Sequence, residues 1–393
     1  MIDPDLLALP FYEPRHVALA QRIDAWCQAH AALWQAPDGD PERTGRDILR
    51  GLADDGWLAF LDPDAGPAAA PDGDFRSVCL MREALAHADD LADYAFSIQA
   101  LSARPLQRYG SDEQRQRYLP QLAKGTLVGS FAVSEEEAGS DVAAVALRAE
   151  RVAGGYVLNG HKAWVANGSI ADLHCVIART GEGPGALGLT AFLVPATAPG
   201  VRVREKVSVI APRAFANLAF DDCRLPDDSV LGRPGSGFVV AMDVLDRFRV
   251  TVGAAAVGFA RRAADAALAR ARSRPMHGGR LFDLQTVQAA FADIEVKLNA
   301  AALLVARAAW EIDRGNRHFA KHSSIAKLYA TEVAQEVVDA SLQVFGAAGL
   351  VKDSVTERLY RQVRSLRIYE GASEVQKTII AGSLGRHRPG RPG

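Results

Sequence analysis

The chain has 393 residues, of which 49% are hydrophobic and 23% are charged, and its formal net charge is −2. This composition is ordinary for a globular enzyme, and the length predicts two or three structural units. The nearly balanced charge gives no electrostatic reason to expect binding to nucleic acid or to an anionic membrane surface.

No membrane insertion is predicted, because no apolar run reaches the roughly 18 residues that span a bilayer. The first residues carry Asp3 and Asp5, whereas a secretory signal begins basic and then turns apolar. The four cysteines are far apart and form no CxxC pair, so we expect reduced, mostly buried thiols of a cytoplasmic protein. They are Cys27, Cys79, Cys175 and Cys223.

The first part of the chain has apolar residues at helical spacing. This pattern predicts helices over 14–30, 44–57, 75–88 and 92–109, with a Pro- and Gly-rich loop over 62–74. Ser111 is expected to cap a further short helix.

From Gly129 to about Pro226, short runs of β-branched and aromatic residues are broken by glycine, which is typical of a small β domain. A strand over 156–158 is expected to run into a turn at Asn159–Gly160, and 181–185 reads as a hairpin loop. Further strands are predicted over 173–178, 189–194, 201–206 and 217–220.

Helical patterns return after Gly237, over 238–273, 283–315 and 323–345, and their length favours a bundle. No GxGxxG follows a strand, so a Rossmann dinucleotide site is not expected. The fold class is therefore mainly α with a central β domain. The predicted divisions are 1–128 (helical), 129–236 (β), 237–384 (helical bundle) and 385–393 (disordered tail).

Four segments occur in an order and spacing that is similar to the acyl-CoA dehydrogenase family over nearly the whole chain. They read FAVSEEEAGSD from Phe131, YVLNGHKAWVANG from Tyr156, QVFGAAG from Gln343 and RIYEGASEVQ from Arg367. The resemblance implies a flavoprotein with a helical domain, a β-barrel-like domain and a C-terminal four-helix bundle, which binds FAD and oxidises an acyl thioester.

The first segment resembles the family's flavin-contacting loop. The resemblance gives the backbone of Phe131 and Val133 and the hydroxyl of Ser134 to the flavin, and Ser140 to the pantetheine arm. It also places Trp164 against the isoalloxazine. Ala166 stands where the family has a threonine whose hydroxyl reaches the flavin, which is a departure.

A second group of flavin contacts is implied across a subunit boundary, which predicts a homo-oligomer such as a tetramer. Arg274 matches the family's pyrophosphate-binding arginine, and a guanidinium can fork onto phosphate oxygens. Gln343, Gly346 and Ala347 match a segment that holds FAD across the same boundary.

Glu370 occupies the position of the family's catalytic base, between Tyr369 and Gly371, which we assign to the substrate site. By resemblance, Asp246 accepts a hydrogen bond from the pantetheine and Arg249 braces the site. Glu370 would remove the α-proton, and its amide would help to stabilise the thioester oxygen as in an oxyanion hole. The product would be a trans-2-enoyl thioester, and an electron-transferring flavoprotein would take the electrons.

Three alternatives stay open at this point. Because Ala166 replaces the family's threonine, a flavin oxidase or monooxygenase on the same fold is one alternative. The segment 209–220 departs from the family pattern and weakly resembles relatives that act on acyl groups tethered to an acyl carrier protein. A flavin-free interaction protein built on the same scaffold would be colourless.

Overall fold

The computed structural model describes residues 2–34, 39–62 and 74–386. By internal packing the chain divides into two units. The helical unit comprises Met1–Ala32, Asp74–Asp90 and Asp246–Gly393, and the sheet unit comprises Leu33–Gly73 and Leu91–Leu245.

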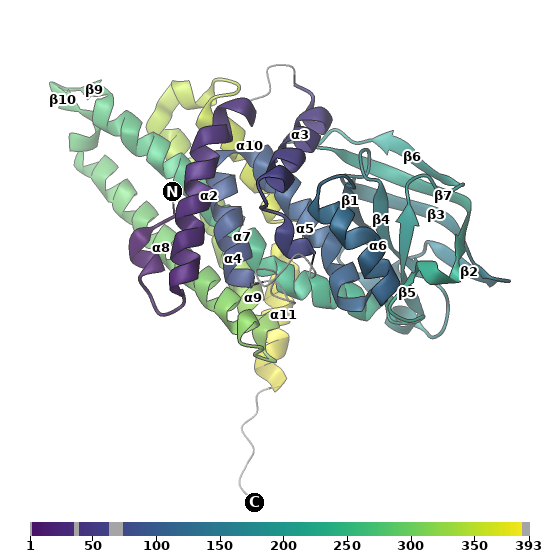
Figure 1. The fold of residues 1–393 in the computed structure, drawn as a ribbon. Helices are drawn as coiled ribbons and strands as arrows, with labels where there is room; N and C mark the ends of the chain where they lie inside the picture. Colours follow the sequence, from purple (N-terminus) through teal and green to yellow (C-terminus); the bar gives the residue numbers. More distant parts are fainter. Residues whose placement is uncertain (1, 35–38, 63–73, 387–393) are drawn as a thin grey trace, which may run out of the picture. The chain divides into compact units, whose positions relative to one another are not determined.

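The sheet unit is built on an eight-stranded sheet of order β6-β7-β3-β2-β4-β5-β8, with β1 beside β4 (Figure 1). Strands β4 and β5 are almost entirely buried, whereas β6 is largely exposed at the edge of the sheet. The strands are β1 (Gly129–Ala132), β2 (Arg148–Val152), β3 (Gly155–Ala166), β4 (Leu173–Arg179), β5 (Leu189–Pro195), β6 (Val201–Lys206), β7 (Phe215–Pro226) and β8 (Val230–Leu231).

Strand β3 is longer than predicted, and the expected turn at Asn159–Gly160 is wrong. The strand continues to Ala166, and its pairing with β7 shifts register between Leu158 and Gly160. Gly160 has φ 137°, which glycine adopts without strain, so the chain can bulge without leaving the sheet.

Three helices of the sheet unit, α3 (Pro41–Asp54), α5 (Asp90–Tyr109, from residue 91 onward) and α6 (Asp112–Ala123), pack beside these strands. Gln99 of α5 joins them: its amide nitrogen donates to the carbonyls of Leu122 and Leu127, and its amide oxygen accepts from Gly129 N of β1. Because Gln99 is fully buried, these bonds fix where β1 begins relative to the helices.

In the helical unit, α9 (Phe319–Phe345) is in contact with α8, α10 and α11, while α4 packs against α8. Phe75 of α4 meets Phe248 of α7 edge to face, with ring centroids 6.0 Å apart. The other helices are α1 (Pro4–Leu7), α2 (Pro14–Trp34, to residue 32), α4 (Phe75–Ala88), α7 (Gly237–Ser273, from residue 246), α8 (Gln285–Asp313), α10 (Val355–Leu366) and α11 (Ser373–Arg386).

Most predicted helices are confirmed, and α4 agrees at both ends. The cap at Ser111 is confirmed as a capping box, in which Gln114 Oε1 accepts from Ser111 N at 2.9 Å. Helix α10 was not predicted. The central residues of the loop at 62–74 and residues 387–393 of the tail lie outside the described residues, whereas Gly385 still belongs to α11.

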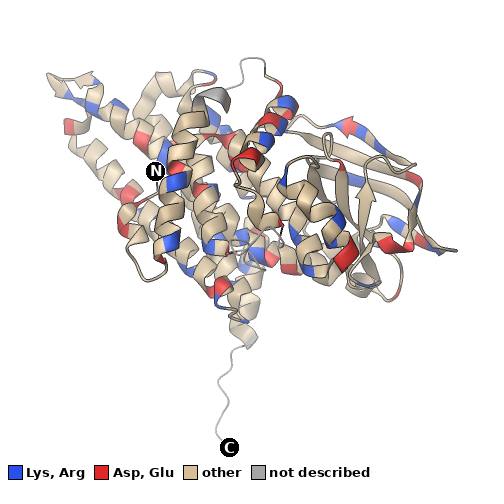
Figure 2. Cartoon of the chain, in the orientation of Figure 1, with Lys and Arg blue, Asp and Glu red and all other residues tan. Residues whose placement is uncertain are grey.

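The fold class, mainly helical with a central β region, is confirmed. All four cysteines are free and buried, as predicted. No helix in the described parts is long and apolar enough to cross a membrane. Acidic and basic side chains are interspersed along the helices and strands (Figure 2).

Candidate active site

Glu370 and Gly371 form a tight turn in the helical unit, between the end of α10 and the start of α11. Both residues have left-handed backbone, with φ 52° at Glu370 and 93° at Gly371. This conformation costs a residue other than glycine roughly 1–2 kcal/mol, so the surrounding contacts must hold Glu370 there.

Side chains from three helices hold the two carbonyl groups of this turn. Arg249 Nε of α7 donates to Glu370 O at 3.1 Å, and Lys327 Nζ of α9 donates to Gly371 O at 2.7 Å. Gln376 Nε2 of α11 lies 3.3 Å from Glu370 O and 2.8 Å from Gly371 O. The backbone of the turn is thereby fixed from several sides.

Arg249 is only 3% exposed and forms an ion pair with Asp246, one turn earlier on α7. The structure therefore brings together three of the predicted site residues: Asp246, Arg249 and Glu370. Tyr369 N donates to Ser365 O at 3.2 Å, so the tyrosine continues the end of α10 into the turn.

A second ionic group braces the far side of the turn. Arg367 and Glu332 are 2.7 Å apart, and Ser373 Oγ donates to the same glutamate at 2.5 Å. Ser373 N also donates to Arg367 O at 3.2 Å, which links the residues on either side of the turn. These bonds lower the pKa of Glu332 against the opposing effect of burial, so its carboxylate stays ionised between the two partners.

In the sheet unit, the predicted flavin loop leaves the end of β1. Phe131 and Ser134 are half-buried, Val133 is buried and Ser140 is exposed. The loop is joined to β3, because Ala163 N donates to Ser134 O at 2.9 Å.

Trp164 lies on β3 with φ 52°, and its side chain is 50% exposed although the strand around it is buried. Its backbone N–H donates to Asn217 Oδ1 of β7 at 2.9 Å. Ala166 is half-buried at the end of the same strand, opposite Phe215. The indole of Trp164 is therefore exposed on β3, the strand that is hydrogen-bonded to the predicted flavin loop.

The predicted inter-subunit group lies in the helical unit, at the ends of α7 and α9. Gly346 ends α9 with φ 62°, and a Cβ built there would lie 3.7 Å from Arg274 Nη1. Gln343 and Ala347 are exposed beside it. The structure thus brings Arg274 close to Gly346, although the two residues are 72 positions apart in the sequence.

Two buried lysines were missed as functional candidates. Lys162 lies within β3, with its Nζ 2.7 Å from Glu135 Oε1 and 2.8 Å from Val133 O. Lys327 was not singled out, although its helical spacing from Ser323, Ala330 and Ala334 places it on the buried face of α9. Burial lowers the pKa of each lysine to about 8, against the raising effect of nearby carboxylates.

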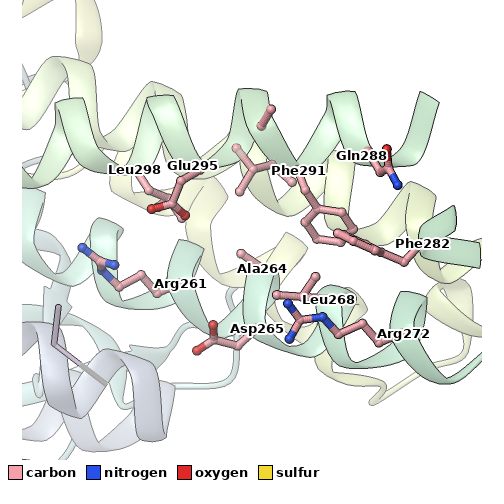
Figure 3. A pocket seen from close by; sticks show the side chains of 12 residues that line it. Arg261, Ala264, Asp265, Leu268, Arg272, Phe282, Gln288, Phe291, Glu295 and Leu298 are labelled. Atoms are coloured by element: carbon pink, nitrogen blue, oxygen red, sulfur yellow. The ribbon is translucent and has the colours of Figure 1, made fainter. Parts of the chain in front are cut away.

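A cavity of about 340 Å³ lies elsewhere in the helical unit, between α7 and α8 (Figure 3). Arg261, Asp265 and Arg272 of α7 face Phe291 and Glu295 of α8 across it. None of the predicted site residues lines this cavity. Among the described residues no group of three or more His, Cys, Asp or Glu side chains is placed to hold a metal ion.

Comparison with known proteins identifies the family. The chain matches the acyl-CoA dehydrogenase N-terminal domain over residues 13–126, the middle domain over 130–223 and the C-terminal domain over 235–385. It is 33% identical over 382 residues to the probable acyl-CoA dehydrogenase FadE25 of Mycobacterium tuberculosis, covering 97% of both chains.

Two solved structures are similar over nearly their whole length. Butyryl-CoA dehydrogenase from Megasphaera elsdenii has a TM-score of 0.87 and 29% identity, covering 94% of this chain and 98% of that one. PigA with FAD and proline has a TM-score of 0.85 and 25% identity, covering 95% and 98%. The chain therefore belongs to the acyl-CoA dehydrogenase family of FAD-dependent oxidoreductases.

Proposed function

We propose that this protein uses FAD to remove two hydrogens from the Cα–Cβ bond of an acyl-CoA, with Glu370 as the base and a trans-2-enoyl-CoA as the product. The observation that carries the proposal is the strained turn at Glu370, whose two carbonyls are held by Arg249, Gln376 and Lys327. A strained carboxylate-bearing turn held so thoroughly suits a group that must keep one geometry.

The residues present fit FAD in two ways. Trp164 offers a half-exposed indole that a flat ring system can cover. Gly346 leaves open the space beside the Arg274 guanidinium that a side chain would fill, and a guanidinium suits a pyrophosphate. Phe131, Val133, Ser134, Ala166, Gln343 and Ala347 complete the proposed cofactor-binding set.

When bound, FAD supplies the acceptor for the hydride that leaves the β-carbon. The chain's own part is to place a base and to stabilise charge. The Glu370 carboxylate takes the α-proton, and the N–H of Glu370 donates to the thioester oxygen as negative charge develops there. Ser140, Asp246, Arg249, Tyr369 and Gly371 complete the proposed substrate site.

Several finer assignments belong to this proposal. They are a homo-oligomer in which Arg274 and Gln343 serve a neighbouring subunit, an electron-transferring flavoprotein as acceptor, and a cytoplasmic location. The divisions of the chain near residues 128 and 236 also stay predictions. An acyl carrier protein in place of CoA, or an oxidase reaction, remains the alternative that segment 209–220 and Ala166 keep open.

The test is anaerobic titration of the purified protein, loaded with FAD, with acyl-CoAs from four to sixteen carbons. Bleaching of the flavin by an acyl-CoA, with formation of the enoyl product, is expected. A protein that stays colourless after FAD reconstitution would contradict the flavin assignment. A yellow protein bleached only by acyl carrier protein thioesters would support the alternative carrier. Sedimentation of the FAD-loaded protein as a monomer would contradict the shared site.

A further inference from the structure

Lys327 is a charged residue in an otherwise uncharged stripe of α9. Its side chain is fully buried, and its Nζ donates to the carbonyl oxygen of Gly371 at 2.7 Å. Taking an ammonium group out of water is costly unless it meets acceptors and opposite charge. Burying this ammonium group is costly, and the group contacts the turn that carries the proposed base. We therefore expect Lys327 to have a role at that turn.

The contact acts on the peptide that follows Gly371, next to the peptide that follows Glu370. Two carbonyls in succession, those of Glu370 and Gly371, accept from side chains on three helices, and the Gly371 carbonyl accepts from both Lys327 and Gln376. Because peptide groups are planar, fixing both carbonyls fixes the peptide planes on each side of Gly371 and thereby the left-handed backbone torsions of Gly371. The first of these planes begins at the Cα of Glu370, so it constrains the backbone from which the Glu370 side chain projects.

Charge adds to this geometric effect. The charged groups that act on Lys327 come from four elements: Glu370 of the turn and Glu332 of α9 attract it, Glu374 of α11 attracts it, and Arg249 of α7 repels it. The ammonium is therefore placed where its positive charge favours the ionised form of the Glu370 carboxylate. A base must be ionised to accept a proton. The positive charge of Lys327 and its hydrogen bond to the Gly371 carbonyl therefore both favour Glu370 as a base.

We propose that Lys327 is a positioning residue for the base: its ammonium group holds the Gly371 carbonyl, fixes the strained turn, and favours the ionised carboxylate of Glu370. The inference rests on the proposed function of Glu370. It adds a residue that does not touch the substrate and that acts through the turn.

The test compares Lys327→Met with Lys327→Arg in the FAD-loaded full-length protein. Methionine keeps most of the unbranched stem but removes the charge and the donor, whereas arginine keeps both. For Lys327→Met we expect the rate of flavin reduction by acyl-CoA to fall roughly 10–100-fold, the size of effect that a misplaced group produces. The acid limb of the rate–pH profile should move up by roughly 0.5–1 pH unit, because a nearby positive charge has been removed. Lys327→Arg should restore part of both.

Lys377→Met is the matched control, because Lys377 lies on α11 six residues after Gly371 but is exposed to solvent. It should leave the rate and the acid limb unchanged. A shift of the acid limb is the decisive readout, since a residue that merely stabilised the fold would lower the melting temperature without moving it. An unshifted limb in a folded Lys327→Met protein overturns the proposal.

Gln376→Met keeps the proposal falsifiable if Lys327→Met does not fold. It removes the other donor to the Gly371 carbonyl without changing any charge, so the rate should fall while the acid limb stays in place. An unchanged rate would contradict the view that hydrogen bonds to this carbonyl position the base.

The parent protein and Glu370→Gln distinguish a failure of the proposed function from a failure of the role of Lys327. If the parent is inactive, or if Glu370→Gln is fully active, the proposed function fails. If both behave as proposed and Lys327→Met matches the parent, the role of Lys327 alone fails.

Discussion

Lys162 and Glu135 form a buried ion pair in the sheet unit, with Nζ 2.7 Å from Oε1. The glutamate also accepts from the backbone N–H groups of Ala146 and Leu147 at 2.7 and 2.9 Å, and the lysine donates to Val133 O. The loop that carries Val133 and Ser134 is thus fixed by a charge pair at its base. Lys327 does the same for the Glu370 turn, so each unit holds a loop of proposed site residues with a buried lysine.

Breaking the pair should therefore be costly. Because removing one partner leaves a buried charge without compensation, Glu135→Gln and Lys162→Met should each lower the free energy of unfolding by about 3–5 kcal/mol. The double variant should lose less than the sum of the two. Chemical denaturation of the four proteins gives the cycle. Glu136→Gln is the control: Glu136 is exposed and 3.4 Å from Arg204, so it should cost no more than about 1 kcal/mol. Equal losses for Glu135 and Glu136 would contradict the prediction.

Replacing the base should separate binding from chemistry. Glu370→Gln keeps the shape of the side chain and should keep the bound FAD, but it offers no basic oxygen. We expect the rate of anaerobic flavin bleaching by an acyl-CoA to fall by roughly 10²–10⁴-fold. Glu336→Gln makes the same change on the exposed face of α9, outside the proposed site, and should stay near the parent rate. A Glu370→Gln protein that bleaches as fast as the parent would remove Glu370 from the mechanism.

The turn at Gly371 should not tolerate a side chain. Its φ is 93°, and a Cβ there would lie 2.5 Å from Gln376 Nε2, one of the donors that hold the turn. Gly371→Ala should cost at least about 1–2 kcal/mol of stability and slow flavin reduction more than tenfold. Gly382→Ala on α11 meets no atom within 4 Å and should have the opposite sign, a gain of roughly 0.5–1 kcal/mol. Thermal melts and reduction rates of both variants decide this.

Acid should weaken the sheet unit through His174. This residue is buried on β4, 2.6 Å from Ser130 Oγ, and burial lowers its pKa from 6.5 to about 4. Between pH 6.5 and 4 the unfolded chain binds a proton there that the folded chain does not, so stability falls as the pH falls. This single group changes the free energy of unfolding by at most about 1.4 kcal/mol per pH unit in that window. Melting curves should become less pH-dependent in His174→Gln, and an unchanged slope would contradict the assignment. His161→Gln, on the exposed face of β3, is the control.

The sequence by itself determined those elements whose signals are local. The apolar spacing over 75–88 predicted α4 with both ends, since a helix depends on contacts between residues three and four apart. Ser111 and Gln114 determine a capping box within four residues. The position of Glu370 before a glycine and a helix start also follows from neighbouring residues, and the four segments indicated the family that the comparisons confirm.

Tertiary structure alone decided what the lysines do. Lys162 follows a Gly and a His and resembles a turn residue, yet the bulge at Gly160 keeps it in β3, where it meets Glu135, 27 positions earlier. Lys327 meets Gly371, 44 positions later, and nothing near either residue in the sequence indicates that contact. The same holds for residues 1–32 and 74–90, which pack with the helices after residue 246. A buried charge is stable only where the fold brings a distant acceptor to it, and the partner's identity is set by packing between elements that local sequence does not encode.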